Sequence, residues 1–74
     1  MKFPEKLKEL RTSNGLSQIE LGEILNIHSM SVSRWERAEA MPPVKTVIKL
    51  AMLFSVSTDE LLCVNEGGDD NAVY

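Results

Sequence analysis

The sequence predicts an all-α fold built from five short helices, and three observations lead to this fold class. Apolar residues recur at spacings of three and four along most of the chain, which is the period of a helix that faces a core. The Ser-x-x-Glu stretches at 17–20 and 57–60 have the form of a capping box, which marks a helix start, and no stretch shows the alternation of a half-buried strand. A chain of 74 residues suits a single small domain.

The first helix is expected to begin at about Pro4. Proline fits a first helical turn because the amide that it lacks has no helical partner there in any case. Phe3, Leu7 and Leu10 recur at helical spacing, and Gly15 suits the left-handed conformation in which many helices end.

The second helix is expected to begin after Ser17 and to run to about Leu25. Ser17 and Glu20 form a capping box, in which each side chain accepts from the other's amide, and Leu16 with Leu21 forms the matching hydrophobic staple. The side chains expected to face inward are Leu21, Ile24 and Leu25. Gly22 is costly inside a helix, so it is either a chance occurrence or the mark of a close approach by another helix.

The third helix is expected after the turn at 26–28 and should end near Ala38. Either His28 or Ser29 serves as its cap, and the helical spacing points Val32 and Trp35 toward the core.

The fourth helix follows a break at Met41-Pro42-Pro43. The fifth is predicted by the same signals as the second, a capping box and a hydrophobic staple. The apolar residues at helical spacing in the fourth are Val44, Val47, Ile48, Ala51 and Phe54. Ser57 and Glu60 form a second capping box, with Val56 and Leu61 as its staple, and this last helix is expected to continue to about Val64.

The chain divides by composition into a domain at 1–64 and a segment at 65–74. The latter carries glycines and acids without an apolar period, which predicts a flexible acidic C-terminal tail. The formal charge is −3, but five acids and no Lys or Arg lie from Asp59 onward. Residues 1–58 therefore hold six acids against eight bases, a balance of +2, and the overall acidity does not exclude a polyanionic partner.

Several classes of protein are excluded by composition. No apolar run approaches the ~18 residues of a membrane span, and the charged N-terminus is unlike a secretion signal, so we expect no membrane association and a cytoplasmic location. Cys63 is the one cysteine, and with His28 it makes no metal-ligand set, so neither a metal nor another cofactor is expected. A lone histidine with no paired acid and no glycine-rich phosphate loop argue against an enzyme.

Two short helices joined by a tight turn and flanked by supporting helices form a helix-turn-helix arrangement. The motifs here are Leu-Ser-Gln-x-Glu-Leu-Gly at 16–22, Ser-Val-Ser-Arg-Trp-Glu-Arg at 31–37, Thr-Val-Ile-Lys-Leu-Ala at 46–51 and Val-Ser-x-Asp-Glu-Leu-Leu at 56–62. Together they resemble the Cro/repressor-type helix-turn-helix proteins of phage and bacteria, the XRE family, over about residues 5–63. The resemblance implies a lambda-repressor-like DNA-binding domain whose second and third helices form the helix-turn-helix.

The resemblance also implies a set of contacts with double-stranded DNA. Gln18 matches the glutamine that grips a backbone phosphate and braces the recognition helix, and Arg37 matches a position next to a loop that meets phosphate. On the recognition helix, the matched positions that usually face base edges are Ser29, Met30, Ser33 and Arg34, with Ser31 at the flank toward the backbone. The matched positions used for packing and bracing are Val32, Trp35 and the stem of Glu36.

Side-chain chemistry supports these roles unequally. Arg34 can donate two hydrogen bonds to guanine, worth ~1–3 kcal/mol of discrimination, unless it is a solvated arginine paired with a nearby glutamate. Met30 offers an apolar contact suited to a thymine methyl, unless it belongs to the core. Serines discriminate poorly, and Gln18 has the alternative of a plain helix-start residue.

Three positions leave alternatives open. Arg11, with Lys6 and Lys8, is interpreted as part of a solvated face, or as a phosphate contact near the Gln18 end. His28 stands where the family usually has a serine or threonine cap, and it is either a cap or turn residue or a phosphate donor. Pro43 stands where a polar cap usually begins the fourth helix, which is expected to shift the cap without breaking the helix.

The expected function is a sequence-specific transcriptional regulator, most simply a repressor of a palindromic operator. A single reading head binds weakly, so we expect a homodimer joined near the fifth helix, where Leu62, Cys63 and Val64 cluster, with 72–74 as a further contact or a mobile end. With no sensory domain expected, control would come from concentration, a partner protein or turnover. The alternative is a protein-binding module, an antitoxin or anti-repressor that holds a basic partner with its acidic C-terminus.

Overall fold

The computed structural model describes residues 1–64, so the tail predicted at 65–74 lies outside the described residues. The helices are α1 (Phe3–Ser13), α2 (Gln18–Leu25), α3 (Ser29–Glu36), α4 (Val44–Phe54) and α5 (Thr58–Leu62). No strand occurs in residues 1–64. The prediction of an all-α fold of five helices is therefore confirmed.

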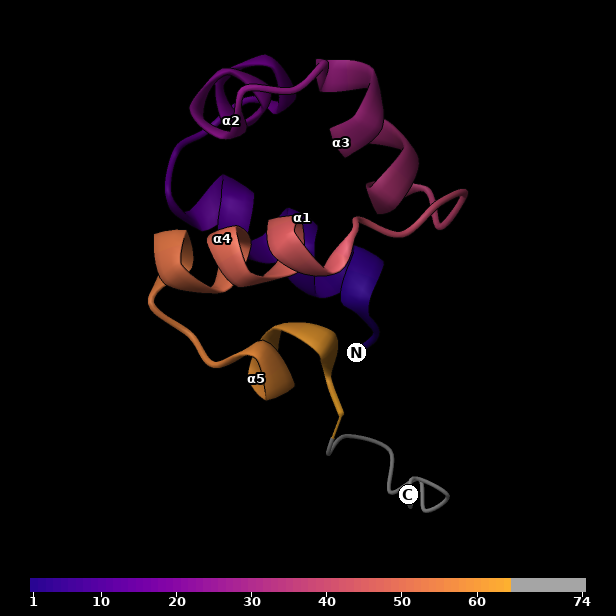
Figure 1. The fold of residues 1–74 in the computed structure, drawn as a ribbon, viewed down its shortest axis with the longest axis vertical. Helices are drawn as coiled ribbons and strands as arrows, with labels where there is room; N and C mark the ends of the chain where they lie inside the picture. Colours follow the sequence, from indigo (N-terminus) through magenta and orange to yellow (C-terminus); the bar gives the residue numbers. More distant parts are fainter. Residues whose placement is uncertain (65–74) are drawn as a thin grey trace.

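The helices are arranged in tiers around one core. In Figure 1, α2 and α3 lie together at the top, α4 crosses the middle in front of α1, and α5 lies below α4. Each helix sends apolar side chains inward, and the buried set is Phe3, Leu7, Leu21, Leu25, Val32, Trp35, Val47, Leu50, Ala51, Phe54 and Leu61. Because α3 contributes Val32 and Trp35, one side of this helix is fixed by the core, as predicted.

Most of the predicted helix starts and stops are present as hydrogen bonds or backbone angles. Ser17 Oγ accepts from the Glu20 amide at 3.0 Å, and Glu20 Oε1 accepts from the Ser17 amide at 2.8 Å. Gly15 is left-handed, with φ of +70°. The second box is half formed, because Ser57 Oγ accepts from the Glu60 amide at 3.0 Å while Glu60 Oε2 lies 3.6 Å from Lys6 Nζ.

Three helix boundaries differ slightly from the prediction. Helix α3 ends at Glu36 before a left-handed Ala38 (φ +61°), and α5 ends at Leu62 before a left-handed Cys63 (φ +58°). Pro43 is itself the cap residue of α4, with extended backbone, so the cap is not shifted and the helix is not broken.

The predicted inward face was wrong at three positions. Ile24, Val44 and Ile48 are exposed, whereas Leu50 is completely buried. Helical spacing alone leaves the centre of a buried face undetermined, and here Leu21, Gly22 and Leu25 set that centre on α2. Ile48 follows the buried Val47 by one residue, about 100° around the helix, so it projects beside the core.

Gly22 allows the turn and the start of α3 to approach α2 closely. A Cβ atom at this position would lie 2.9 Å from the Ile27 carbonyl oxygen and 3.2 Å from the Ser29 amide nitrogen. Both atoms belong to the backbone and cannot rotate away. This close approach, one of the two interpretations of the glycine, is therefore confirmed, and its partner is the turn together with the first residue of α3.

We expect Gly22→Ala to lower the free energy of unfolding by about 1–3 kcal/mol, the usual cost of overpacking. Helix propensity alone predicts the opposite sign, since alanine is better than glycine in a helix by ~1 kcal/mol. Urea unfolding followed by the fluorescence of the buried Trp35 measures the change. Glu23→Ala, at an exposed position of the same helix, is the control, and a Gly22→Ala variant as stable as the parent would contradict the close approach.

Within residues 1–64, no helix combines the length and apolar character needed to cross a lipid bilayer.

Candidate functional site

The turn between α2 and α3 is fixed by backbone hydrogen bonds. Asn26 ends α2 in the left-handed conformation (φ +60°), and the amide of Ile27 donates to the Gly22 carbonyl at 2.9 Å. Ile27 packs its side chain against the core. The start of α3 is thereby held against α2 at a set angle, which is the requirement for presenting a helix to a partner.

A buried ion pair ties α1 to the end of α3. Arg11 Nε donates to Glu36 Oε2 at 2.7 Å, and Arg11 Nη2 donates to Glu36 Oε1 at 2.9 Å. The third nitrogen, Nη1, donates to the Leu16 carbonyl at 2.8 Å. The side chains of Arg11 and Glu36 are 10% and 5% exposed, so solvent and salt screen this pair far less than a surface pair.

The predicted solvated face of α1 is therefore wrong at Arg11. Its guanidinium points into the molecule, where Glu36 and the Leu16 carbonyl take its hydrogen bonds. The hydrogen bonds to Glu36 raise the pKa of Arg11, although burial acts to lower it, and the side chain stays charged. Arg11 is thus a support of α3, and its contact with phosphate stays a prediction.

Gln18 joins the same network from the first residue of α2. Its Nε2 donates to Glu36 Oε1 at 3.1 Å, so one carboxylate receives hydrogen bonds from both α1 and α2. The part of the prediction that has Gln18 bracing the recognition helix is confirmed by this contact. Gln18 is half-buried, and its contact with phosphate stays a prediction.

The outer face of α3 carries the predicted base-reading residues. Met30 is 57% exposed, so the alternative that it belongs to the core is wrong. Arg34 is exposed, and it forms no ion pair within residues 1–64. The three serines at 29, 31 and 33 are half-buried beside these side chains. A donor-rich, partly apolar strip thus faces solvent on the side of α3 opposite Val32 and Trp35.

Arg37 lies just beyond the end of α3 and points along the surface. Its Nη1 donates to Glu39 Oε2 at 3.0 Å, and its Nε donates to the Ser33 carbonyl at 3.4 Å. Both charged side chains are about half exposed, and an exposed pair of this kind is worth little and exchanges easily with another anion. The structure therefore leaves Arg37 accessible at the end of the helix.

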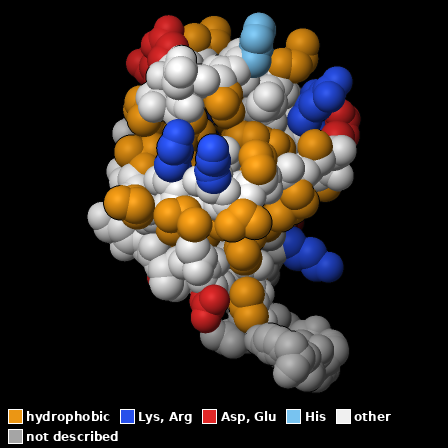
Figure 2. Space-filling view, viewed as in Figure 1, with side chains coloured by type: hydrophobic (Ala, Val, Ile, Leu, Met, Phe, Trp, Pro, Cys, Tyr) orange, Lys and Arg blue, Asp and Glu red, His pale blue; other side chains and the backbone are white. Residues whose placement is uncertain are grey.

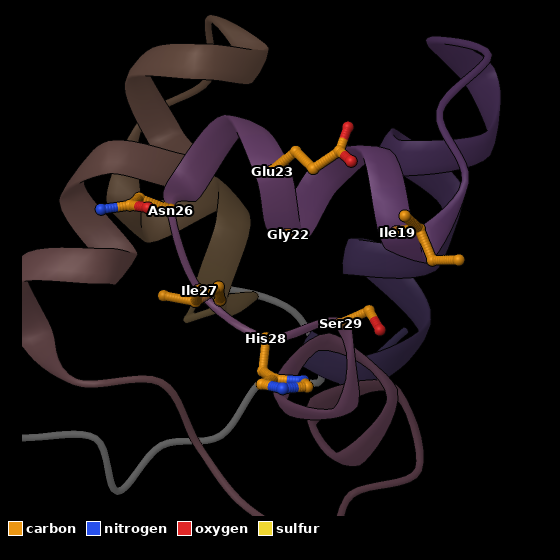
Figure 3. A pocket seen from close by; sticks show the side chains of 7 residues that line it. All are labelled: Ile19, Gly22, Glu23, Asn26, Ile27, His28 and Ser29. Atoms are coloured by element: carbon orange, nitrogen blue, oxygen red, sulfur yellow. The ribbon is translucent and has the colours of Figure 1, made fainter.

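His28 occupies the cap position of α3 but makes no capping hydrogen bond with its side chain. It is exposed at the rim of a hollow of about 560 Å³ that lies between α2 and the start of α3. Figure 3 shows Gly22 facing this hollow, with His28 and Ser29 on the side away from α2. His28 is thus a turn residue, and a hydrogen bond from its imidazole to a DNA phosphate stays a prediction.

Sequence reasoning missed the Arg11–Glu36 pair. The two residues are 25 positions apart, and each lies in a helix that also carries exposed charges, so no periodic signal marks them as partners. The side-chain groups within residues 1–64 include no cluster of three or more His, Cys, Asp or Glu that could hold a metal ion.

Comparison with known proteins gives a family and several relatives. Residues 7–61 match the helix-turn-helix family HTH_3. The chain is 38% identical to the HTH-type transcriptional activator BcrR of Enterococcus faecalis over 89% of its length and 32% of that protein. It is 39% identical to the HTH-type transcriptional regulator ImmR of Bacillus subtilis (strain 168) over 96% of its length and 56% of that protein.

A solved structure shares the same fold. The crystal structure of a transcriptional regulator from Listeria innocua superposes with a TM-score of 0.83 at 29% sequence identity, covering 93% of this chain and 64% of that one. The chain thus spans between about a third and two thirds of the length of these relatives. What the Listeria innocua regulator shares with this chain is the fold of 93% of its length.

Proposed function

The chain belongs to the helix-turn-helix family, and from that premise we propose that it is a sequence-specific repressor that binds a palindromic operator as a dimer. The membership supports the expectation of a DNA-binding regulator. The observation that carries the proposal is the two-sided character of α3. Val32 and Trp35 are buried on one side, while Met30 and Arg34 project from the other.

We assign the readout of sequence to Arg34 and Met30. An arginine fork can donate to O6 and N7 of guanine, and a methionine side chain suits the methyl group of thymine. Ser29 and Ser33 lie on the same side and can donate to base edges or phosphates. Only Arg34 combines a strong donor pair with full access among these side chains, so we expect one guanine per half-site to dominate specificity.

Phosphate contacts would fix the orientation of α3 on the duplex. We assign them to Gln18 at the start of α2, Ser31 on the flank of α3, and Arg37 at its end. Because Gln18 already donates to Glu36, a phosphate contact by its side chain would link the backbone of DNA to the network that holds α3. The balance of +2 in residues 1–58 implies few such contacts and a shallow salt dependence for each copy.

We expect Arg34→Ala to reduce the preference for the selected operator over random duplex by about 5- to 150-fold, the equivalent of 1–3 kcal/mol. Gln18→Ala should instead weaken binding to both DNAs by a similar factor, since a phosphate contact carries no sequence information. Fluorescence anisotropy at fixed salt measures all affinities. Arg34→Lys keeps the charge without the two-pronged donor and is the control. An intact sequence preference in Arg34→Ala would show that the readout is assigned wrongly.

Dimerisation is proposed because one reading head makes few contacts. The predicted patch near α5 is smaller than expected, since Leu62 packs against the core and Cys63 is half-buried. Val64 and, at the end of α4, Leu53 remain accessible, with 36% and 37% exposure. Binding to a palindrome requires the two α3 helices to lie about 34 Å apart, in successive major grooves, so this contact would have to hold two copies at that spacing.

Analytical ultracentrifugation at high micromolar concentration tests the dimer. We expect a mass that rises toward twice 8.3 kDa with concentration, and further when operator DNA is added. Val64→Asp should shift the transition to higher concentration, because a charge would be buried at the contact. A mass that stays at 8.3 kDa without DNA, together with one copy of the chain per operator when DNA is added, would rule the dimer out.

A further inference from the structure

Helix α4 carries a stripe of exposed apolar side chains that the core does not use. Val44, Ile48 and Met52 are 75%, 47% and 74% exposed. They are spaced four residues apart, so they lie one above the other on the same side of the helix. Figure 2 shows this row of apolar side chains running along α4 on the visible face of the molecule. We call these three residues the α4 stripe.

Two lysines border the α4 stripe. Lys45 and Lys49 are exposed and each lies one residue after a member of the stripe, so they project beside it. Figure 2 shows two basic side chains next to the apolar row. Helix α4 contains no acid, and neither lysine has an ion-pair partner within residues 1–64. The surface is therefore complementary to a binding partner that carries both apolar and acidic side chains.

A second copy of α4 does not meet this requirement. If two α4 helices packed through their stripes, the four flanking lysines would gather at one contact with no acid from either helix. Like charges brought together in this way oppose association. The contact that we propose for the dimer is centred on Leu53 and Val64 and not on the α4 stripe.

The chain itself contains a segment with the required chemistry. Residues 66–74 read Glu-Gly-Gly-Asp-Asp-Asn-Ala-Val-Tyr, so a pair of acids is followed by three consecutive apolar or aromatic residues. We propose that this segment docks in cis along α4, with its Ala-Val-Tyr end on the α4 stripe and its acids beside Lys45 and Lys49. The surface is an internal docking site, and it does not depend on DNA binding.

The geometry of the chain permits this contact. Helix α5 packs beneath α4 (Figure 1), so the described part of the chain, which ends at Val64, stops close to α4. Residues 69–74 span up to about 20 Å when extended, against about 16 Å for the length of α4. A short tether also supplies a local concentration in the millimolar range, so a weak contact suffices to keep the α4 stripe covered.

Methyl NMR of the full chain tests the docking. We expect cross-relaxation between the ring of Tyr74, the single tyrosine, and the methyl groups of Ile48 and Met52. The Val73→Ser/Tyr74→Ser variant should lose these signals and shift the Ile48 and Met52 resonances. The methyls of Ile19 and Met30, exposed on α2 and α3, should stay in place. The fluorescence of the buried Trp35, if unchanged, shows that the variant stays folded. Asn71→Ser is the matched control and should change nothing.

A mixed sample of labelled and unlabelled chains decides between this segment and its rivals. Docking in cis predicts contacts within one chain that are independent of concentration and weaken at high salt. Contacts between chains would mean that the segment of a second copy occupies the stripe, and would overturn the proposal. So would Ile48 and Met52 resonances that are identical in the parent and the Val73→Ser/Tyr74→Ser variant. None of these outcomes involves DNA, so the docking and the proposed repressor function succeed or fail separately.

Discussion

The position of α3 depends on one carboxylate. Glu36 accepts two hydrogen bonds from Arg11 of α1 and one from Gln18 of α2, at 2.7–3.1 Å. A buried charge of this kind is costly unless it is fully paired, and the penalty for breaking the pair far exceeds the net benefit of making it. Such a contact therefore adds little to overall stability but strongly favours one arrangement of the three helices. The end of α3 is held by charge, and its start is held by the close approach at Gly22.

Fixing both ends of α3 explains how so small a chain can present the reading surface that we propose. The inner side of the helix packs into the core through Val32 and Trp35, so the outer side is not needed for packing. Met30 and Arg34 can then be substituted without disturbing the fold. If Gln18 contacts a phosphate while it donates to Glu36, this one side chain would link the DNA backbone directly to α3, the helix that we propose reads the sequence.

Local rules in the sequence predicted much of this fold. The capping box at Ser17 and the left-handed Gly15 could be recognised because their partners are at most three residues away. The resemblance to known regulators placed α3 and its outer face correctly. Spacing alone could not decide whether Ile24 or Ile48 faces the core, since that depends on where neighbouring helices lie. Arg11 was misread for the same reason, because a buried ion pair across 25 residues leaves no local pattern.

The buried pair of Arg11 and Glu36 sets the orientation of α3, and a double-mutant cycle in urea unfolding tests this role most directly. Arg11→Met alone should cost about 3–5 kcal/mol by leaving Glu36 without its main partner. Adding Glu36→Gln should return a large part of that loss, giving a coupling energy above ~1 kcal/mol. Sucrose in the buffer keeps the weaker variants folded. Two substitutions whose effects simply add would show that Arg11 and Glu36 act independently, and would contradict this account.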